Sequence, residues 1–163
     1  MIPKRVPPCA DRLLSRPQWY LDPGVVSRAK LTRAKWYARI LSSEFFAKTT
    51  VAAITLGHTI HFREESHYNP HTIQGLTLLA HEIKHVEQFE QRGFFRFIGK
   101  YIQDYFSHGY GDDISFEGEA YAFEKLVRTH LLKEARQNGD QKSCLDMEEP
   151  HRPNLNYVLI EPE

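Results

Sequence analysis

The stretch with the clearest chemical potential is the pentapeptide His81-Glu82-Ile83-Lys84-His85, in which two histidines stand four residues apart. On a helix, both imidazoles lie on one face and reach the same divalent cation, with Glu82 beside the open coordination position. The pattern predicts a catalytic Zn²⁺ site in which His81 and His85 bind the metal and Glu82 acts as general base.

The residues around the pentapeptide predict the helix that this chemistry needs. We expect it to begin near Thr72, after Asn69-Pro70, and to end before Gly93. Apolar residues recur at helical spacing through it and define a buried stripe: Leu76, Leu79, Ile83 and Val86.

The whole chain of 163 residues fits one domain, and we expect a mainly helical α+β fold with a small β-hairpin or sheet before the metal-binding helix. Prolines predict an irregular arm over residues 1–26, with one helical turn near 11–16. A helical core then covers 27–137, and an irregular tail covers 138–163.

Within the core, the periodicity predicts helices over 27–48, 94–106 and 116–137, and a hairpin over 50–63 that turns at Gly57-His58. The second strand of the hairpin alternates polar and apolar residues, as expected for a strand with one exposed face. Such a strand could serve as an edge that pairs with an extended peptide substrate.

Four other histidines precede the metal helix in a strand and a Pro-containing loop, where they share no common face. We interpret them as surface or loop residues and not as ligands: His58, His61, His67 and His71.

Composition excludes several function classes. Lys+Arg and Asp+Glu are 21 each, so net charge does not indicate a nucleic acid or an anionic membrane as partner. No apolar run reaches the roughly 18 to 20 residues of a membrane span, and the N-terminus is not a secretory signal. Cys9 and Cys144 are interpreted as free thiols in a reducing compartment, and the alternative is a disulfide that ties the two ends of the chain together. Without a signal peptide or a membrane span, a cytoplasmic location is expected, with export by a non-classical system as an alternative.

A catalytic zinc site needs a third protein ligand, and the best candidates are Glu117, Glu119 and Glu124 on the last long helix. Helical-wheel positions place Glu117 and Glu124 on one flank of the core stripe and Glu119 on the other. Geometry alone leaves the choice between these flanks open.

A His-Glu-x-x-His helix followed by a helix bearing Glu-x-x-Ala resembles the gluzincin zinc metallopeptidases, and this resemblance implies a zincin-like domain. The matching segment is Phe116-Glu117-Gly118-Glu119-Ala120-Tyr121, and the resemblance implies that Glu117 is the third ligand. Many gluzincins have Asp four residues after this glutamate, where it hydrogen-bonds a ligand histidine. Here that residue is Tyr121, so the hydrogen bond that orients the ligand histidine must differ from the one in those gluzincins.

Residues of about 50–127 are similar to the bacterial eCIS core domain family, named for extracellular contractile injection systems. The resemblance is carried by Leu-Leu-Ala-His-Glu and His-Val-x-Gln around the metal motif, which are residues 78–82 and 85–88. It implies a peptide or protein substrate and a secretion-system or toxin partner. The alternative is a catalytically weak or inactive zinc-binding scaffold in such a system.

Two further roles are expected near the site. His108 and Tyr110, in a glycine-rich loop, are candidates for a donor that stabilises the oxyanion beside the metal; the alternative is that they are loop residues with no role. The arm over residues 1–26 could cover the cleft as a self-inhibitory segment.

Overall fold

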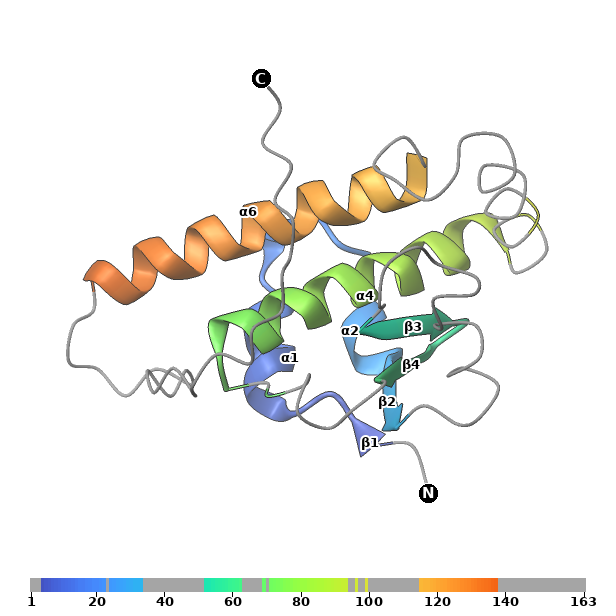
Figure 1. Cartoon of the computed structure of the whole chain (residues 1–163), viewed down its shortest axis with the longest axis horizontal. Coiled ribbons are helices and arrows are strands. Elements are labelled where there is room, and N and C mark those ends of the chain that lie inside the picture. Colours follow the sequence, from blue (N-terminus) through green and yellow to red (C-terminus); the bar gives the residue numbers. More distant parts are fainter. Residues whose placement is uncertain are drawn as a thin grey trace.

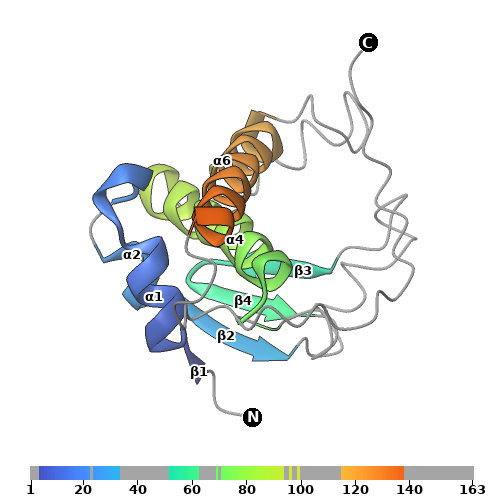
Figure 2. The ribbon, with the colours of Figure 1, turned by 90° about the vertical axis from the view of Figure 1, so that its left-hand side faces the viewer.

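The computed structural model describes residues 4–22, 24–33, 52–62, 69, 71–93, 96, 99 and 115–137. Within them, the long helix α4 (Ile73–Arg92) lies between a four-stranded sheet and a second long helix, α6 (Ser115–Gln137) (Figures 1 and 2). The mainly helical α+β fold predicted from the sequence, with a small sheet before the helix that carries His81 and His85, is confirmed.

Helix α4 has the boundaries that its sequence predicts. Thr72 is the N-cap, and its Oγ1 accepts a hydrogen bond of 3.0 Å from the backbone N–H of Gly75. Gly93 ends the helix with φ of 77°. Gly75 is also required by packing, because a Cβ atom there would collide with the backbone of Asn69.

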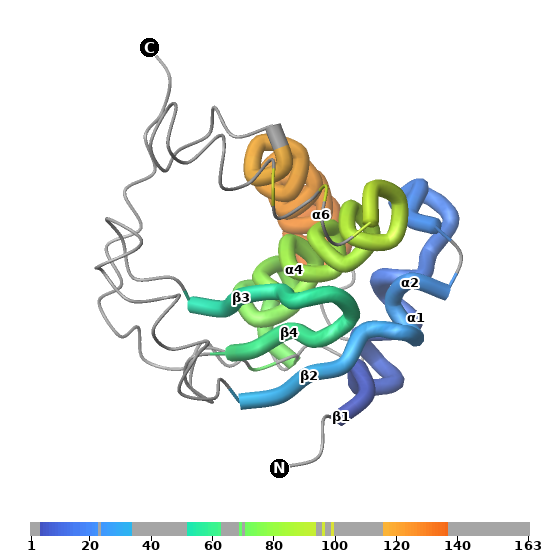
Figure 3. The backbone as a smooth tube through the Cα atoms, turned by 90° about the vertical axis from the view of Figure 1, so that its right-hand side faces the viewer, coloured from blue at the N-terminus to red at the C-terminus, as the bar shows by residue number. Residues whose placement is uncertain are grey.

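The predicted hairpin is formed by β3 (Ala53–Leu56) and β4 (Thr59–Phe62), which pair antiparallel through the turn at Gly57. Two further strands complete the sheet in the order β1-β2-β4-β3 (Figure 3). They are β1 (Lys4–Arg5) and β2 (Lys30–Arg33), and β2 runs parallel to β4.

This topology overturns two expectations for the hairpin. Strand β4 is an interior strand with β2 and β3 on its two sides, so it cannot offer a free edge to a peptide. Among the described residues, β3 is one of the two edge strands instead. His61 is also buried, at 5% exposure, and is not a surface residue.

The helix predicted over 27–48 is wrong at its start. Helix α2 covers only Val25–Arg28, and β2 follows from Lys30. The backbone N–H of Lys30 donates a 2.8 Å hydrogen bond to the carbonyl of His58, and Leu31 is buried in the sheet. Pairing with β4 therefore overrides the helical periodicity here. Residues 34–48 lie outside the described part of the chain.

The N-terminal segment is not an irregular arm. It forms helix α1 (Pro8–Leu14) and the short 3-10 helix η1 (Pro17–Trp19), each with a proline at its start, where the missing N–H costs nothing. Its apolar side chains join the same core as those of α4: Val6, Ala10, Leu14, Trp19, Val25 and Val26. The prolines begin helices in this segment instead of preventing them.

Cys9, in α1, is disulfide-bonded, so the prediction of a free thiol is wrong at this position. Because disulfides are uncommon in reducing compartments, this removes the cysteine argument for a cytoplasmic location.

Helix α6 confirms the predicted helix, and its core stripe is buried as expected: Phe116, Ala120, Phe123, Val127 and Leu131. In the described part of the chain, no helix has both the length and the apolar character that crossing a bilayer requires. Other predictions fall outside the described residues: most of the helix at 94–106, His67, the loop with His108 and Tyr110, Cys144, and the tail at 138–163.

Candidate metal centre

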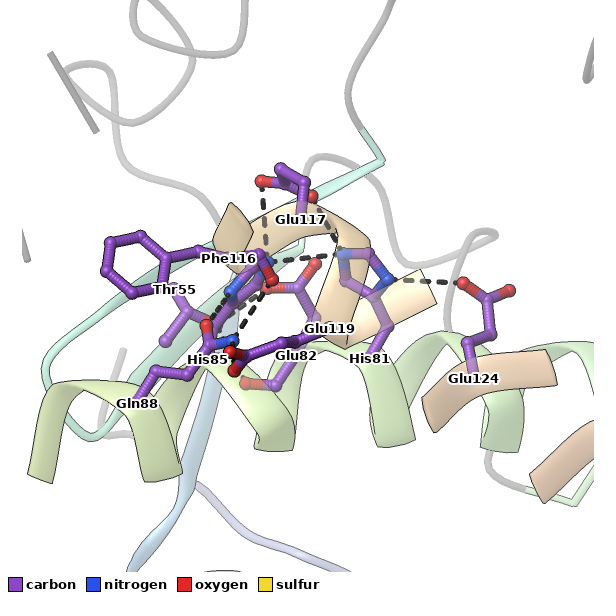
Figure 4. Close-up of polar contacts among 9 residues, drawn as sticks. All are labelled: Thr55, His81, Glu82, His85, Gln88, Phe116, Glu117, Glu119 and Glu124. Carbon is purple, nitrogen blue, oxygen red and sulfur yellow. Dashed lines mark hydrogen bonds and ion pairs between the residues drawn. The ribbon is translucent and has the colours of Figure 1, made fainter. Parts of the chain in front are cut away.

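Three buried side chains converge between α4 and α6: His81, His85 and Glu117 (Figure 4). One ligand atom from each lies within 4.8 Å of the others. Nε2 of His81 is 3.3 Å from one Glu117 carboxylate oxygen, and Nε2 of His85 is 3.5 Å from the other. The two Nε2 atoms are 3.2 Å apart. These are the three residues that the sequence motif and the resemblance indicate as ligands.

The fold brings these residues together through helix geometry. His81 and His85 are one turn apart on α4, so their rings share a face. Helices α4 and α6 run antiparallel, so the first turn of α6 lies over the second half of α4 (Figure 1). Glu117 lies in that first turn, where the helix dipole favours a carboxylate.

The donor set fits a divalent cation. Each imidazole has its Nδ1 atom near an acceptor: the Glu124 carboxylate at 3.2 Å from His81, and the Gln88 side-chain oxygen at 2.9 Å from His85. With the protons on Nδ1, two Nε2 lone pairs and a carboxylate face one another at short range, which is repulsive unless a cation lies among them. The group therefore could hold a metal ion, and two imidazoles with one carboxylate suit zinc.

Without metal, a proton supplies the positive charge. Burial disfavours the charged imidazole of His81, but Glu117 and Glu124 outweigh burial and raise its pKa to about 10. Burial likewise disfavours the Glu117 carboxylate, but the neighbouring imidazoles of His81 and His85 outweigh burial and lower the pKa of Glu117. The pocket is thus suited to one bound positive charge.

This charge balance predicts how stability depends on pH. In the metal-free protein the His81 pKa rises from 6.5 to about 10 on folding, so its stabilisation is complete below 6.5 and disappears as pH rises towards 10. The lowered pKa of Glu117 gives stabilisation above its usual 4.5 that is lost as pH falls further. His81, His85 and Glu117 would hold a metal ion only after His81 loses this proton, so metal binding would strengthen with pH.

We therefore expect the Tm difference between zinc-loaded and zinc-free protein to widen from pH 6 to pH 9. Thermal unfolding at each pH, with and without zinc, measures it. A constant difference would contradict the exchange of a proton for the metal at His81.

Glu82 is buried beside the three candidate ligands, with 4% exposure. The hydroxyl of Thr55 in β3 donates a 2.6 Å hydrogen bond to one Glu82 carboxylate oxygen. This bond fixes one oxygen and leaves the other as the proton acceptor that a general base needs. Thr55 was not singled out from the sequence, although its place on the buried face of a strand next to Ala53 is a usable signal.

The two alternative ligands have different surroundings. Glu124 shares a flank with Glu117, as the helical wheel predicts, and its carboxylate reaches the far nitrogen of His81 (Figure 4). Nδ1 of His81 lies within ion-pair distance of the Glu124 carboxylate, but the two groups are not aligned as a hydrogen bond. Glu119 lies outside the group of three, bonded to Gln88 at 3.0 Å and 3.6 Å from Arg92.

Tyr121 does not take the place of the gluzincin aspartate. Its ring packs edge-on against His81, with centroids 4.7 Å apart. Glu124, three residues further along α6, instead supplies the carboxylate beside His81. A carboxylate therefore lies at ion-pair distance from Nδ1 of His81, but without the aligned hydrogen bond that the aspartate would supply.

The other described histidines of the hairpin region stay apart from this group. His58 is exposed and lies 3.0 Å from Glu90, and His71 is exposed before α4. His61 is buried in β4 but is not a member of the ligand group.

Comparison with known proteins locates a family match over part of the chain. Residues 28–93 match the model of a protein family described as the eCIS core domain. The matched residues include all of α4, and therefore His81, Glu82 and His85. The match begins before the expected 50–127 and ends before Glu117. No curated protein and no solved structure matches the chain. Over residues 28–93, the chain is similar to the eCIS core domain family.

Proposed function

We propose that this protein is a zinc-dependent metallopeptidase. The observation that carries the proposal is the convergence of His81, His85 and Glu117 in one buried group with Glu82 alongside. Among the described residues this group has three members, and catalytic zinc sites have three protein ligands with a fourth position for water.

In this proposal each residue has one role. A bound zinc ion would lower the pKa of a water molecule and polarise the substrate carbonyl. His81, His85 and Glu117 hold the ion, and Glu82 accepts the proton of the attacking water. As the new C–O bond forms and the peptide C–N bond breaks, Glu82 passes this proton to the departing amine nitrogen.

The proposed substrate is an extended peptide segment of a protein. Strand β3 is one of the two edge strands of the sheet among the described residues, and Thr55 connects it to Glu82. A peptide paired with β3 would run past the general base. A secretion or toxin-delivery partner is a further proposal, supported by the eCIS core domain match.

The alternative function is a zinc-stabilised binding module without turnover. The observation in its favour is burial, because the three ligand residues are exposed by 7%, 6% and 5%. Enclosed zinc sites are characteristic of structural roles, whereas catalytic sites keep an open position.

Zinc removal tests the proposal directly. The purified chain should bind about one zinc and cleave a denatured protein substrate such as casein; a chelator should abolish cleavage, and added zinc should restore it. At zinc 1,000-fold above Kd, the metal should stabilise folding by about 4 kcal/mol and raise Tm by roughly 10 °C. Zinc binding without cleavage would favour the module, and a zinc content near zero would exclude both.

Replacing either histidine identifies the ligands in the same assay. His81→Ala and His85→Ala should each abolish stoichiometric zinc binding, because each leaves only two of the three ligands.

A further inference from the structure

The Gln88 side chain makes three hydrogen-bond contacts beside the proposed site. Gln88 lies on α4, three residues after His85, and its side chain is 1% exposed. We propose that Gln88 is a positioning residue that sets the imidazole tautomer of His85 and ties it to the turn carrying Glu117. This inference rests on the proposed zinc site.

Three contacts satisfy the Gln88 amide (Figure 4). Its oxygen is 2.9 Å from Nδ1 of His85. Its nitrogen donates to the backbone carbonyl of Phe116 at 3.0 Å and to the Glu119 carboxylate at 3.0 Å. Both amide hydrogens and the amide oxygen are therefore in use.

These partners determine which way the amide points. A backbone carbonyl and a carboxylate only accept hydrogen bonds, so the NH₂ group of Gln88 must face Phe116 and Glu119. Its oxygen then faces His85, and Nδ1 of His85 must carry the proton in that contact. In the neutral ring, Nε2 of His85 therefore keeps its lone pair.

That lone pair faces the other candidate ligands. Nε2 of His85 lies 3.5 Å from Glu117 and 3.2 Å from Nε2 of His81. If the proton moved to Nε2, it would occupy the position in which the metal binds. The Gln88 oxygen favours the metal-binding tautomer over the one that blocks it.

The second contact of Gln88 reaches across to α6. Phe116 is the residue before Glu117, so the hydrogen bond to its carbonyl holds the first turn of α6 against α4. The Gln88 side chain thus orients His85 on α4 and also holds Phe116, the residue before Glu117, on α6. Gln88 and Phe116 are 28 residues apart in the sequence.

Methionine at position 88 has nearly the shape of glutamine and makes none of these hydrogen bonds. Losing such a partner of a metal ligand typically costs 10- to 100-fold in metal affinity. We expect Gln88→Met to weaken zinc binding by about this factor, measured by competition with a chromogenic chelator.

Gln91 provides a matched control on the same helix. It is exposed, and its hydrogen bond to Asp22 is long, at 3.4 Å. Gln91→Met should bind zinc as tightly as the wild type. Equal zinc affinity of Gln88→Met and Gln91→Met would overturn the inference.

Nitrogen-15 NMR of the wild-type histidines tests the tautomer even if Gln88→Met fails to fold. In the zinc-loaded protein, Nδ1 of His85 should carry a proton and Nε2 should show the shift of a metal-bound nitrogen. Metal on Nδ1, or a proton on Nε2, would overturn the inference.

The two proposals fail separately. If the wild-type protein binds zinc but does not cleave peptides, the proposed peptidase activity is contradicted and the positioning role of Gln88 is not. If the wild-type protein is active and Gln88→Met keeps full zinc affinity, only the positioning role of Gln88 is contradicted.

Discussion

Glu82→Gln is expected to bind zinc like the wild type while cleaving a denatured protein substrate about 10²- to 10⁴-fold more slowly, the usual contribution of a general base. Glu82 is not one of the three converging ligands, so the metal content should not change. The glutamine oxygen can still accept the hydrogen bond from Thr55, so the buried position stays satisfied. Zinc analysis and a cleavage assay on the same preparation measure both effects.

Glu134→Gln is a suitable control for this substitution. Glu134 lies near the end of α6, partly exposed, and pairs with Arg16. Exposed pairs of this kind contribute about 0 to 1 kcal/mol, so cleavage should stay at the wild-type rate. Wild-type cleavage by Glu82→Gln would exclude Glu82 as the base, and loss of its zinc would indicate a ligand role.

Helix α4 could be predicted from the sequence because all its signals are local. Its cap, its apolar stripe and its terminal glycine lie within 22 residues, from Thr72 to Gly93, and each acts through short-range geometry. The pair His81 and His85 follows from the helical period alone. The hairpin was predictable for the same reason, since its turn and both strands are adjacent.

Strand β2 could not be predicted in this way. Residues 30–33 fit a helical period as well as a strand, and the deciding interaction is pairing with β4, almost thirty residues later. The N-terminal helices illustrate the same limit, because prolines begin helices as readily as they break them. Non-local contacts decide between states that local patterns leave open.

The candidate site shows a similar division. Residue type and spacing indicate His81, Glu82 and His85, whereas Glu117 needed the family resemblance. The partners that orient them come from side-chain packing: Thr55 from a strand, Gln88 from the next helical turn, and Glu124 from the neighbouring helix. A glutamine three residues after a ligand histidine is a signal that could have been used, because this spacing places both on one face.

Trp19→Ala is expected to destabilise the fold by about 3 to 5 kcal/mol, the usual cost of removing a large buried aromatic. Trp19 is 5% exposed, packs edge-on against Phe123 and His130 of α6, and donates a 2.6 Å hydrogen bond to the Leu13 carbonyl. For a chain of this length, Tm should fall by roughly 10 °C or more, measured by thermal unfolding of the zinc-loaded protein.

Tyr20→Ala is the matched control, because it removes an aromatic ring at the next residue, where the side chain is 91% exposed. It should leave Tm nearly unchanged.

A small effect of Trp19→Ala would mean that the N-terminal segment is only loosely attached, as a removable inhibitor of the cleft would be. The contacts oppose that reading: Glu87 of α4 accepts a 2.7 Å hydrogen bond from the backbone of Asp22, and Arg16 pairs with Glu134 of α6 at 2.6 Å. A segment joined in this way to α4 and α6 supports their packing, so it belongs to the structure that positions the candidate metal ligands.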